Sequence, residues 1–64
     1  MSKSKKSQLT RLRILDTARE YFLRKGFKDA HVSEIASLAF IDRRTIYRYF
    51  PTKESLLINI VNML

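Results

Sequence analysis

Residues 41–51 read IDRRTIYRYFP, and this segment decides the fold of the chain. Asp42 is a good N-cap, and the closing proline disfavours helical geometry in the residue before it, so the segment predicts a short helix over residues 43–50. Ile46 and Phe50 are four residues apart and therefore lie on one side of that helix. We expect this apolar side to pack against the core of the protein.

The opposite side of this helix carries positive charge. Arg44 and Arg48 are also four residues apart, and Arg43 and Tyr47 flank them. An exposed arginine face is usually only solvated, but Asp42 is the one acid in the segment and its position makes it the cap. Two arginines in the first turn also oppose the helix dipole, at roughly a few tenths of a kcal/mol each. We therefore expect this face to bind nucleic acid, because arginine pairs bidentately with guanine in the major groove.

A second short helix precedes this one. Apolar residues recur at helical spacing in DAHVSEIASLA, residues 29–39, and predict a helix over residues 32–39. Three residues, FID, connect it to the helix over 43–50, and that spacing is typical of a helix-turn-helix. Only His31 or Asp29 stands where it can cap the earlier helix. The single histidine is interpreted as a cap or surface residue, since no second histidine or thiol exists to share a metal.

A longer helix is predicted over residues 8–25. Gly26 is expected to end it, with Phe27 folding back onto its apolar side. Residues 1–7, MSKSKKS, are basic and have nothing to bury, so they are expected to form a flexible tail that can lie along a phosphate backbone. The apolar stripe of the helix consists of Leu12, Leu15, Ala18 and Phe22.

The last predicted helix covers residues 53–64. Thr52 is its cap, and Glu54 lies in its first turn, where a carboxylate suits the dipole. The helix reaches the end of the chain without a stop signal, which suggests a truncation within it. Its apolar residues are Leu56, Leu57, Ile60, Val61 and Leu64. The four predicted helices give an all-α fold, a homeodomain-like three-helix bundle with a helix-turn-helix and the start of a fourth helix.

Composition agrees with this interpretation. The 64 residues suffice for one small domain, and they include one glycine, one proline and no cysteine. The formal net charge of +7 points to an anionic partner. No apolar run approaches the roughly 18 residues of a membrane span, and the basic N-terminus is not followed by a secretory signal, so a cytoplasmic protein is expected. One histidine, no cysteine and no evident pair of carboxylates in a cleft give an enzyme no support, and no cofactor is expected.

Two other kinds of partner remain as alternatives to nucleic acid. A basic amphipathic chain can lie on an anionic membrane surface, but here the apolar stripes are needed for internal packing. The chain can also be a protein-interaction module that uses the apolar residues between Leu56 and Leu64.

Three motifs resemble the DNA-binding domain of the tetracycline-repressor (TetR) family of bacterial transcriptional regulators. They are ILDTAREYFLRKGF at residues 14–27, VSEIA at 32–36 and TIYRYFPTKESLL at 45–57, in that order and at the spacing of the family. The resemblance implies sequence-specific binding to a double-stranded operator half-site by a regulator, expected to be a repressor. It further implies a missing C-terminal domain that binds an effector and makes the parent protein a homodimer, so the 64-residue chain is expected to be a monomer.

The resemblance also assigns roles to individual residues. Ser33 on the second helix matches a frequent DNA contact, and Tyr49 and Lys53 match phosphate contacts. Positions that touch bases and phosphates on the recognition helix are matched by Arg43, Arg44, Thr45 and Tyr47. Together with Arg48, these residues form the predicted site.

The sequence departs from the family pattern at two places. Phe40 stands where the turn usually carries glycine, and its ring is expected to pack onto the core and offset the strain of about 1 kcal/mol. Ala30 and His31 replace the usual Thr or Ser before the second helix. Neither departure removes a position that reads bases.

Overall fold

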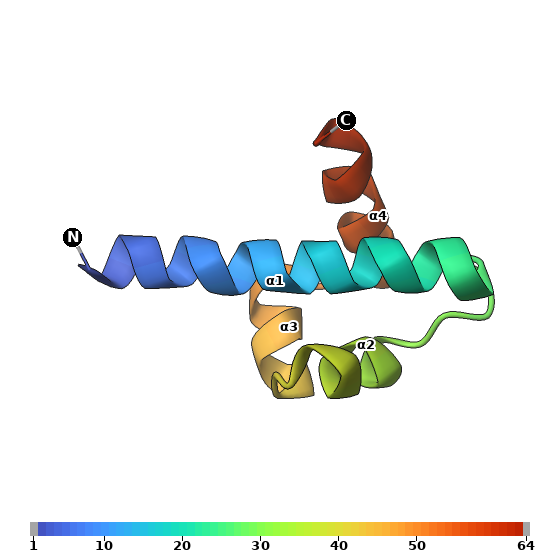
Figure 1. Cartoon of the computed structure of the whole chain (residues 1–64), viewed down its shortest axis with the longest axis horizontal. Helices are drawn as coiled ribbons and strands as arrows, with labels where there is room; N and C mark the ends of the chain where they lie inside the picture. Colours follow the sequence, from blue (N-terminus) through green and yellow to red (C-terminus); the bar gives the residue numbers. More distant parts are fainter. Residues whose placement is uncertain (1, 64) are drawn as a thin grey trace.

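One long helix organises the fold. The computed structural model describes the backbone of residues 2–63 and the side chains of residues 8–63. This part of the chain contains four helices and no strand: α1 (Ser2–Lys25), α2 (Val32–Ala39), α3 (Arg43–Tyr49) and α4 (Lys53–Asn62). α2 and α3 lie on one side of α1 and α4 lies on the other (Figure 1). The predicted all-α helix-turn-helix bundle is confirmed.

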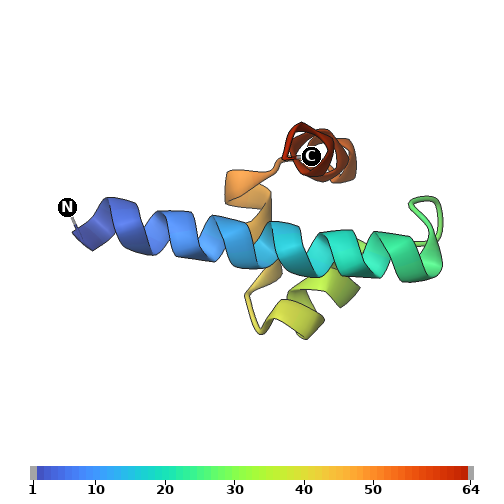
Figure 2. The same ribbon diagram turned by 45° about the horizontal axis from the view of Figure 1, so that its top comes forward.

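The first helix is longer than its prediction, since it begins at Ser2 rather than near Gln8. Residues 2–7, expected as a tail, contain only serine and lysine, and no glycine or proline interrupts them. Lysine has nearly the helix propensity of leucine, so a helix nucleated further along can continue through them. This N-terminal part of α1 projects beyond the other helices in both views (Figures 1 and 2).

The end of α1 agrees with its prediction. Gly26 has a φ of 87°, and its N–H donates to the carbonyl of Phe22 at 2.8 Å. A glycine adopts this left-handed conformation without the steric cost that a side chain would add. Phe27 then folds back, and its ring meets that of Phe22 edge-on at a centroid distance of 5.4 Å.

The core lies where all four helices meet. Of the thirteen core residues in the described part of the chain, α1 contributes five and α2 contributes three. Leu12, predicted as part of the α1 stripe, is 47% exposed, and the buried residues of α1 begin at Ile14. The core residues are Ile14, Leu15, Ala18, Tyr21, Phe22, Ala30, Val32, Ile35, Ala36, Ile46, Phe50, Leu56 and Ile60.

The start of α4 is held by a capping box. The Thr52 hydroxyl accepts from the N–H of Ser55 at 3.0 Å, and the Ser55 hydroxyl accepts from the N–H of Thr52 at 3.2 Å. Two backbone donors are thereby satisfied reciprocally, which confirms Thr52 as the cap. α4 ends at Asn62, and Leu64 of the predicted helix lies outside the described residues.

The turn before α3 differs from its prediction. Phe40 has φ 57° and ψ 42°, the left-handed conformation, and its side chain is 91% exposed. The backbone therefore follows the path that a glycine would take, but the ring does not pack onto the core. The expectation that ring burial offsets the turn strain is wrong, because the left-handed backbone directs this side chain into solvent.

Candidate nucleic-acid interface

α2 and α3 form a helix-turn-helix held by backbone bonds and apolar packing. The N–H of Phe40 donates to the carbonyl of Ser37 at 3.3 Å, and the N–H of Ile41 donates to that of Ala36 at 3.0 Å. These two bonds satisfy carbonyls at the end of α2 that the helix itself leaves open. On the inner side of α2, the buried residues are Val32, Ile35, Ala36 and Ala39.

α3 has one buried side and one exposed side. Ile46 is its single buried residue, and Phe50 directly after the helix is buried as well. On the remaining surface Arg43, Arg44 and Arg48 are exposed, and Tyr47 is 44% exposed. The structure thus brings the four predicted residues together on the solvent side of one short helix.

Asp42 fixes where this helix begins. Its carboxylate Oδ1 accepts from the backbone N–H of Arg44 at 2.8 Å, which confirms Asp42 as the N-cap. The carboxylate is therefore engaged with the backbone. Among the described residues, no ion pair joins an α3 arginine to an acid. Three unpaired guanidinium groups leave this surface with a strong positive potential, which suits a polyanion.

Thr45 and Tyr49 lie between the two sides of α3. Both side chains are partly buried. The Tyr49 ring packs against the core and lies 6.3 Å from the Phe50 ring, with the planes inclined at 37°. Tyr49 therefore has a packing role, as its spacing along the helix allows, and the phosphate contact stays a prediction.

α2 adds a polar edge to the site. Ser33 is exposed in its first turn, and His31 occupies the N-cap position without a side-chain hydrogen bond to the helix. Glu34, which follows Ser33, faces α1, and its carboxylate accepts a hydrogen bond from the hydroxyl of Tyr21. This bond ties the first turn of α2 to α1.

Lys53 is the one predicted site residue whose charge is already engaged. It is the first residue of α4, and its ammonium donates to the carbonyls of Phe27 at 2.7 Å and Ala30 at 3.1 Å. The carbonyl of Lys28 lies 3.4 Å away, and the ammonium is 4.4 Å from the centre of the Phe27 ring. The expected phosphate contact therefore has a strong competitor within the protein.

Arg11 joins elements that the sequence analysis did not connect. Its guanidinium donates to Asn59 Oδ1 on α4 at 2.7 Å and lies 5.5 Å from the centre of the Phe50 ring. The sequence pattern that could have identified this contact is its spacing: Arg11 precedes Leu15 by one helical turn and so lies on the apolar side of α1. One side chain thus links α1, α4 and the end of α3.

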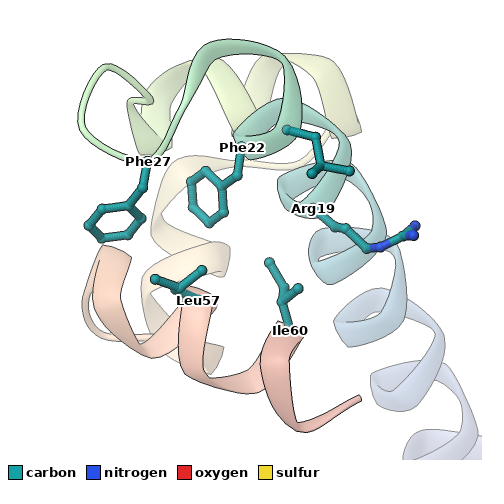
Figure 3. Close-up of a pocket in the computed structure, with 6 residues that line it drawn as sticks. Arg19, Phe22, Phe27, Leu57 and Ile60 are labelled. Atoms are coloured by element: carbon teal, nitrogen blue, oxygen red, sulfur yellow. The ribbon is translucent and has the colours of Figure 1, made fainter. Parts of the chain in front are cut away.

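An apolar cavity lies between α1 and α4, away from the α3 arginines. It measures about 390 Å³ and opens to solvent beside Phe22, Phe27, Leu57 and Ile60 (Figure 3). Ile58, Val61 and Met63 are also exposed on α4. These exposed side chains lie in the segment that the protein-interaction alternative would use.

No group of three or more metal-ligating side chains occurs in the described part of the chain, and none of its helices is long and apolar enough to cross a membrane.

Comparison with known proteins agrees with this geometry. The family model "Bacterial regulatory proteins, tetR family" matches residues 14–60. The transcriptional regulator YuxN of Bacillus subtilis is 41% identical over 49 residues, which are 77% of this chain and 17% of YuxN. The transcriptional regulator UidR of Escherichia coli K12 is 41% identical over 51 residues, which are 80% of this chain and 26% of UidR.

The transcriptional repressor NicS of Pseudomonas putida is 34% identical over 59 residues, which are 92% of this chain and 28% of NicS. The chain therefore spans between 17% and 28% of the length of these three relatives. No solved structure matches.

Proposed function

Because the chain belongs to the TetR family of bacterial regulatory proteins, we propose that it binds double-stranded DNA by placing α3 in the major groove. One observation carries the proposal. α3 buries Ile46 and exposes Arg43, Arg44 and Arg48, and no acid among the described residues pairs with these arginines. A helix of this kind fits the width of the groove and neutralises phosphates at its edges.

The exposed residues of α3 divide by the chemistry they offer. Arg44 and Arg48 can each donate two parallel hydrogen bonds to guanine, and Arg43 can reach either a base or a phosphate. The methyl of Thr45 and the ring of Tyr47 can contact thymine methyl groups. Phosphate contacts from Ser33 on α2 and from Tyr49 would fix the register of the domain on the duplex.

The partner is a single operator half-site if the chain acts as a monomer. Few phosphate contacts are then available, so we expect a dissociation constant no tighter than about 10⁻⁶ M at physiological salt. A longer regulator that contains this domain would be a homodimer on two half-sites, as TetR-type regulators are. NicS is named a repressor, and we propose the same direction of regulation here, in the cytoplasm where bacterial DNA lies.

The test begins with selection of bound duplexes from a random pool, followed by binding measurements on the selected site and on random DNA. Arg44→Ala should weaken the selected site by about 1–3 kcal/mol and random DNA much less, as expected for a residue that reads a base. Arg24→Ala is the matched control, because Arg24 is an exposed arginine in the last turn of α1. Equal losses for both variants would mean that only net charge matters, and the proposal would fail.

A second measurement locates the contact without substitutions. Amide chemical shifts should change at residues 31–34 and 42–52 when duplex DNA is added. Changes confined to the outer side of α1, or to the cavity between α1 and α4, would contradict the placement of α3 in the groove.

A further inference from the structure

Lys53 is held inside the protein by more contacts than any other cation in the described residues. Its ammonium has three donors, and three backbone carbonyls lie around it: Phe27 at 2.7 Å, Ala30 at 3.1 Å and Lys28 at 3.4 Å. The Phe27 ring, 4.4 Å away, covers the charge with its negative face. The side chain is half-buried. The ammonium group is thus fully engaged with protein partners.

The segment that these bonds hold has few other attachments. Between α1 and α2, the N–H of Ala30 donates to the carbonyl of Phe27 at 3.3 Å, and the Ala30 side chain is buried. His31, which follows, forms no side-chain cap on α2. Lys53 is therefore the main polar link between this segment and α4, and it acts beside the Tyr21–Glu34 bond that ties the first turn of α2 to α1. It thereby helps to place the start of α2 and Ser33.

We infer that Lys53 is a positioning residue for the DNA interface rather than a phosphate contact. The inference rests on the proposed function, because it concerns how the same site is assembled. An ammonium that turned toward a phosphate would leave the Ala30 carbonyl without the Lys53 bond, and the Phe27 carbonyl with only its 3.3 Å bond from the N–H of Ala30. A carbonyl left unpaired in a partly buried place is costly. The exposed arginines of α3 face no such competition. Lys53 acts on DNA through the placement of residues 27–33.

The salt dependence of binding separates the two roles. Each phosphate contact contributes close to one unit to the slope of log Kd against log salt concentration. Lys53→Met keeps most of the length of the side chain and removes its charge and donors. We expect a 3- to 10-fold weaker affinity for the selected site, measured at a temperature where the variant is fully folded, with the same slope as the control Arg24→Met. A slope about one unit smaller than that of the control would overturn the inference, and so would wild-type affinity.

A double-mutant cycle tests the route of the effect. If Lys53 acts by placing the start of α2, Lys53→Met should weaken binding less in the background of Ser33→Ala than in the wild type, because the placed contact is already lost. Equal effects in both backgrounds would contradict this route. Amide hydrogen exchange in Lys53→Met should accelerate at residues 27–33 and stay unchanged in α3. Unchanged exchange at 27–33 would show that Lys53 does not hold the segment.

A measurement on the wild-type protein covers the case in which Lys53→Met does not fold. The ¹³Cε resonance of Lys53 should barely move when DNA is added, while the side-chain resonances of Arg44 move strongly. A large shift of the Lys53 signal would indicate a phosphate contact and sink the inference. If the chain bound no selected DNA at all, the proposed function would fail, but the exchange comparison would still decide whether Lys53 holds residues 27–33.

Discussion

Replacing Phe40 tests the geometry of the turn between α2 and α3. Phe40 is the one residue other than glycine with a positive φ in the described part of the chain, at 57°. A side chain in this conformation costs about 1–2 kcal/mol, which Phe40→Gly would recover. The ring is 91% exposed, so its removal forfeits only about a tenth of the roughly 1.5–3 kcal/mol that full burial of a phenylalanine is worth.

The unfolded state reduces this gain. Glycine has more conformational freedom in the unfolded chain, which costs about 0.4–1 kcal/mol of folding stability. The net expectation for Phe40→Gly is a stabilisation of about 0.5–1 kcal/mol. In a domain of this size that corresponds to a rise of about 2–8 °C in melting temperature.

Thermal and urea unfolding, followed by circular dichroism, measure this change, and two further variants make the reason visible. Phe40→Ala keeps a Cβ at the same positive φ and should leave the stability within about 0.5 kcal/mol of the wild type. Phe40→Asn should fall between alanine and glycine, because asparagine tolerates the left-handed conformation. If alanine and glycine both lowered the melting temperature by the same amount, the ring would be contributing packing, and the reasoning from its exposure would be refuted.

Two further predictions concern the residues that hold α3 in place, and a third concerns the oligomeric state. Asp42→Ala should destabilise the domain by about 1 kcal/mol, because it removes the cap bond to the N–H of Arg44; an unchanged urea midpoint would contradict this. Ile46→Ala should lower the free energy of unfolding by about 2–5 kcal/mol, because Ile46 is fully buried. Leu12→Ala, at a half-exposed position, should lower it by less than about 1 kcal/mol. Equal melting temperatures for the two variants would be incompatible with the burial pattern. Sedimentation at micromolar concentration should give a monomer, and a tight dimer would rule out the proposed single half-site.

Much of the fold follows from local signals. Asp42 and Thr52 are strong caps because each side-chain oxygen satisfies a backbone donor, and the structure has both bonds. Gly26 ends α1 for the reason that the sequence indicates. The start of α1 could not be placed in the same way, because a serine and lysine segment is compatible with either a tail or a helix.

The site was predictable to the extent that its residues lie on one helix. The period of the helix separates the arginines of α3 from Ile46 and Phe50, and the structure confirms this separation. The position of the Lys53 ammonium was not predictable in this way. Its partners are the backbone carbonyls of Phe27 and Ala30, and no sequence pattern shows which carbonyls in a distant loop are available as acceptors.

The same reasoning explains why the α3 face depends on the rest of the domain. α3 has seven residues, and an isolated helix below about 12–15 residues is marginal in water. Its form and direction must come from its ends and from the buried Ile46 and Phe50. Phe50 is in turn in contact with the guanidinium of Arg11 on α1. A substitution that loosens this packing should therefore weaken DNA binding without touching any contact residue, because the arginines would lose the common orientation that lets them enter one groove.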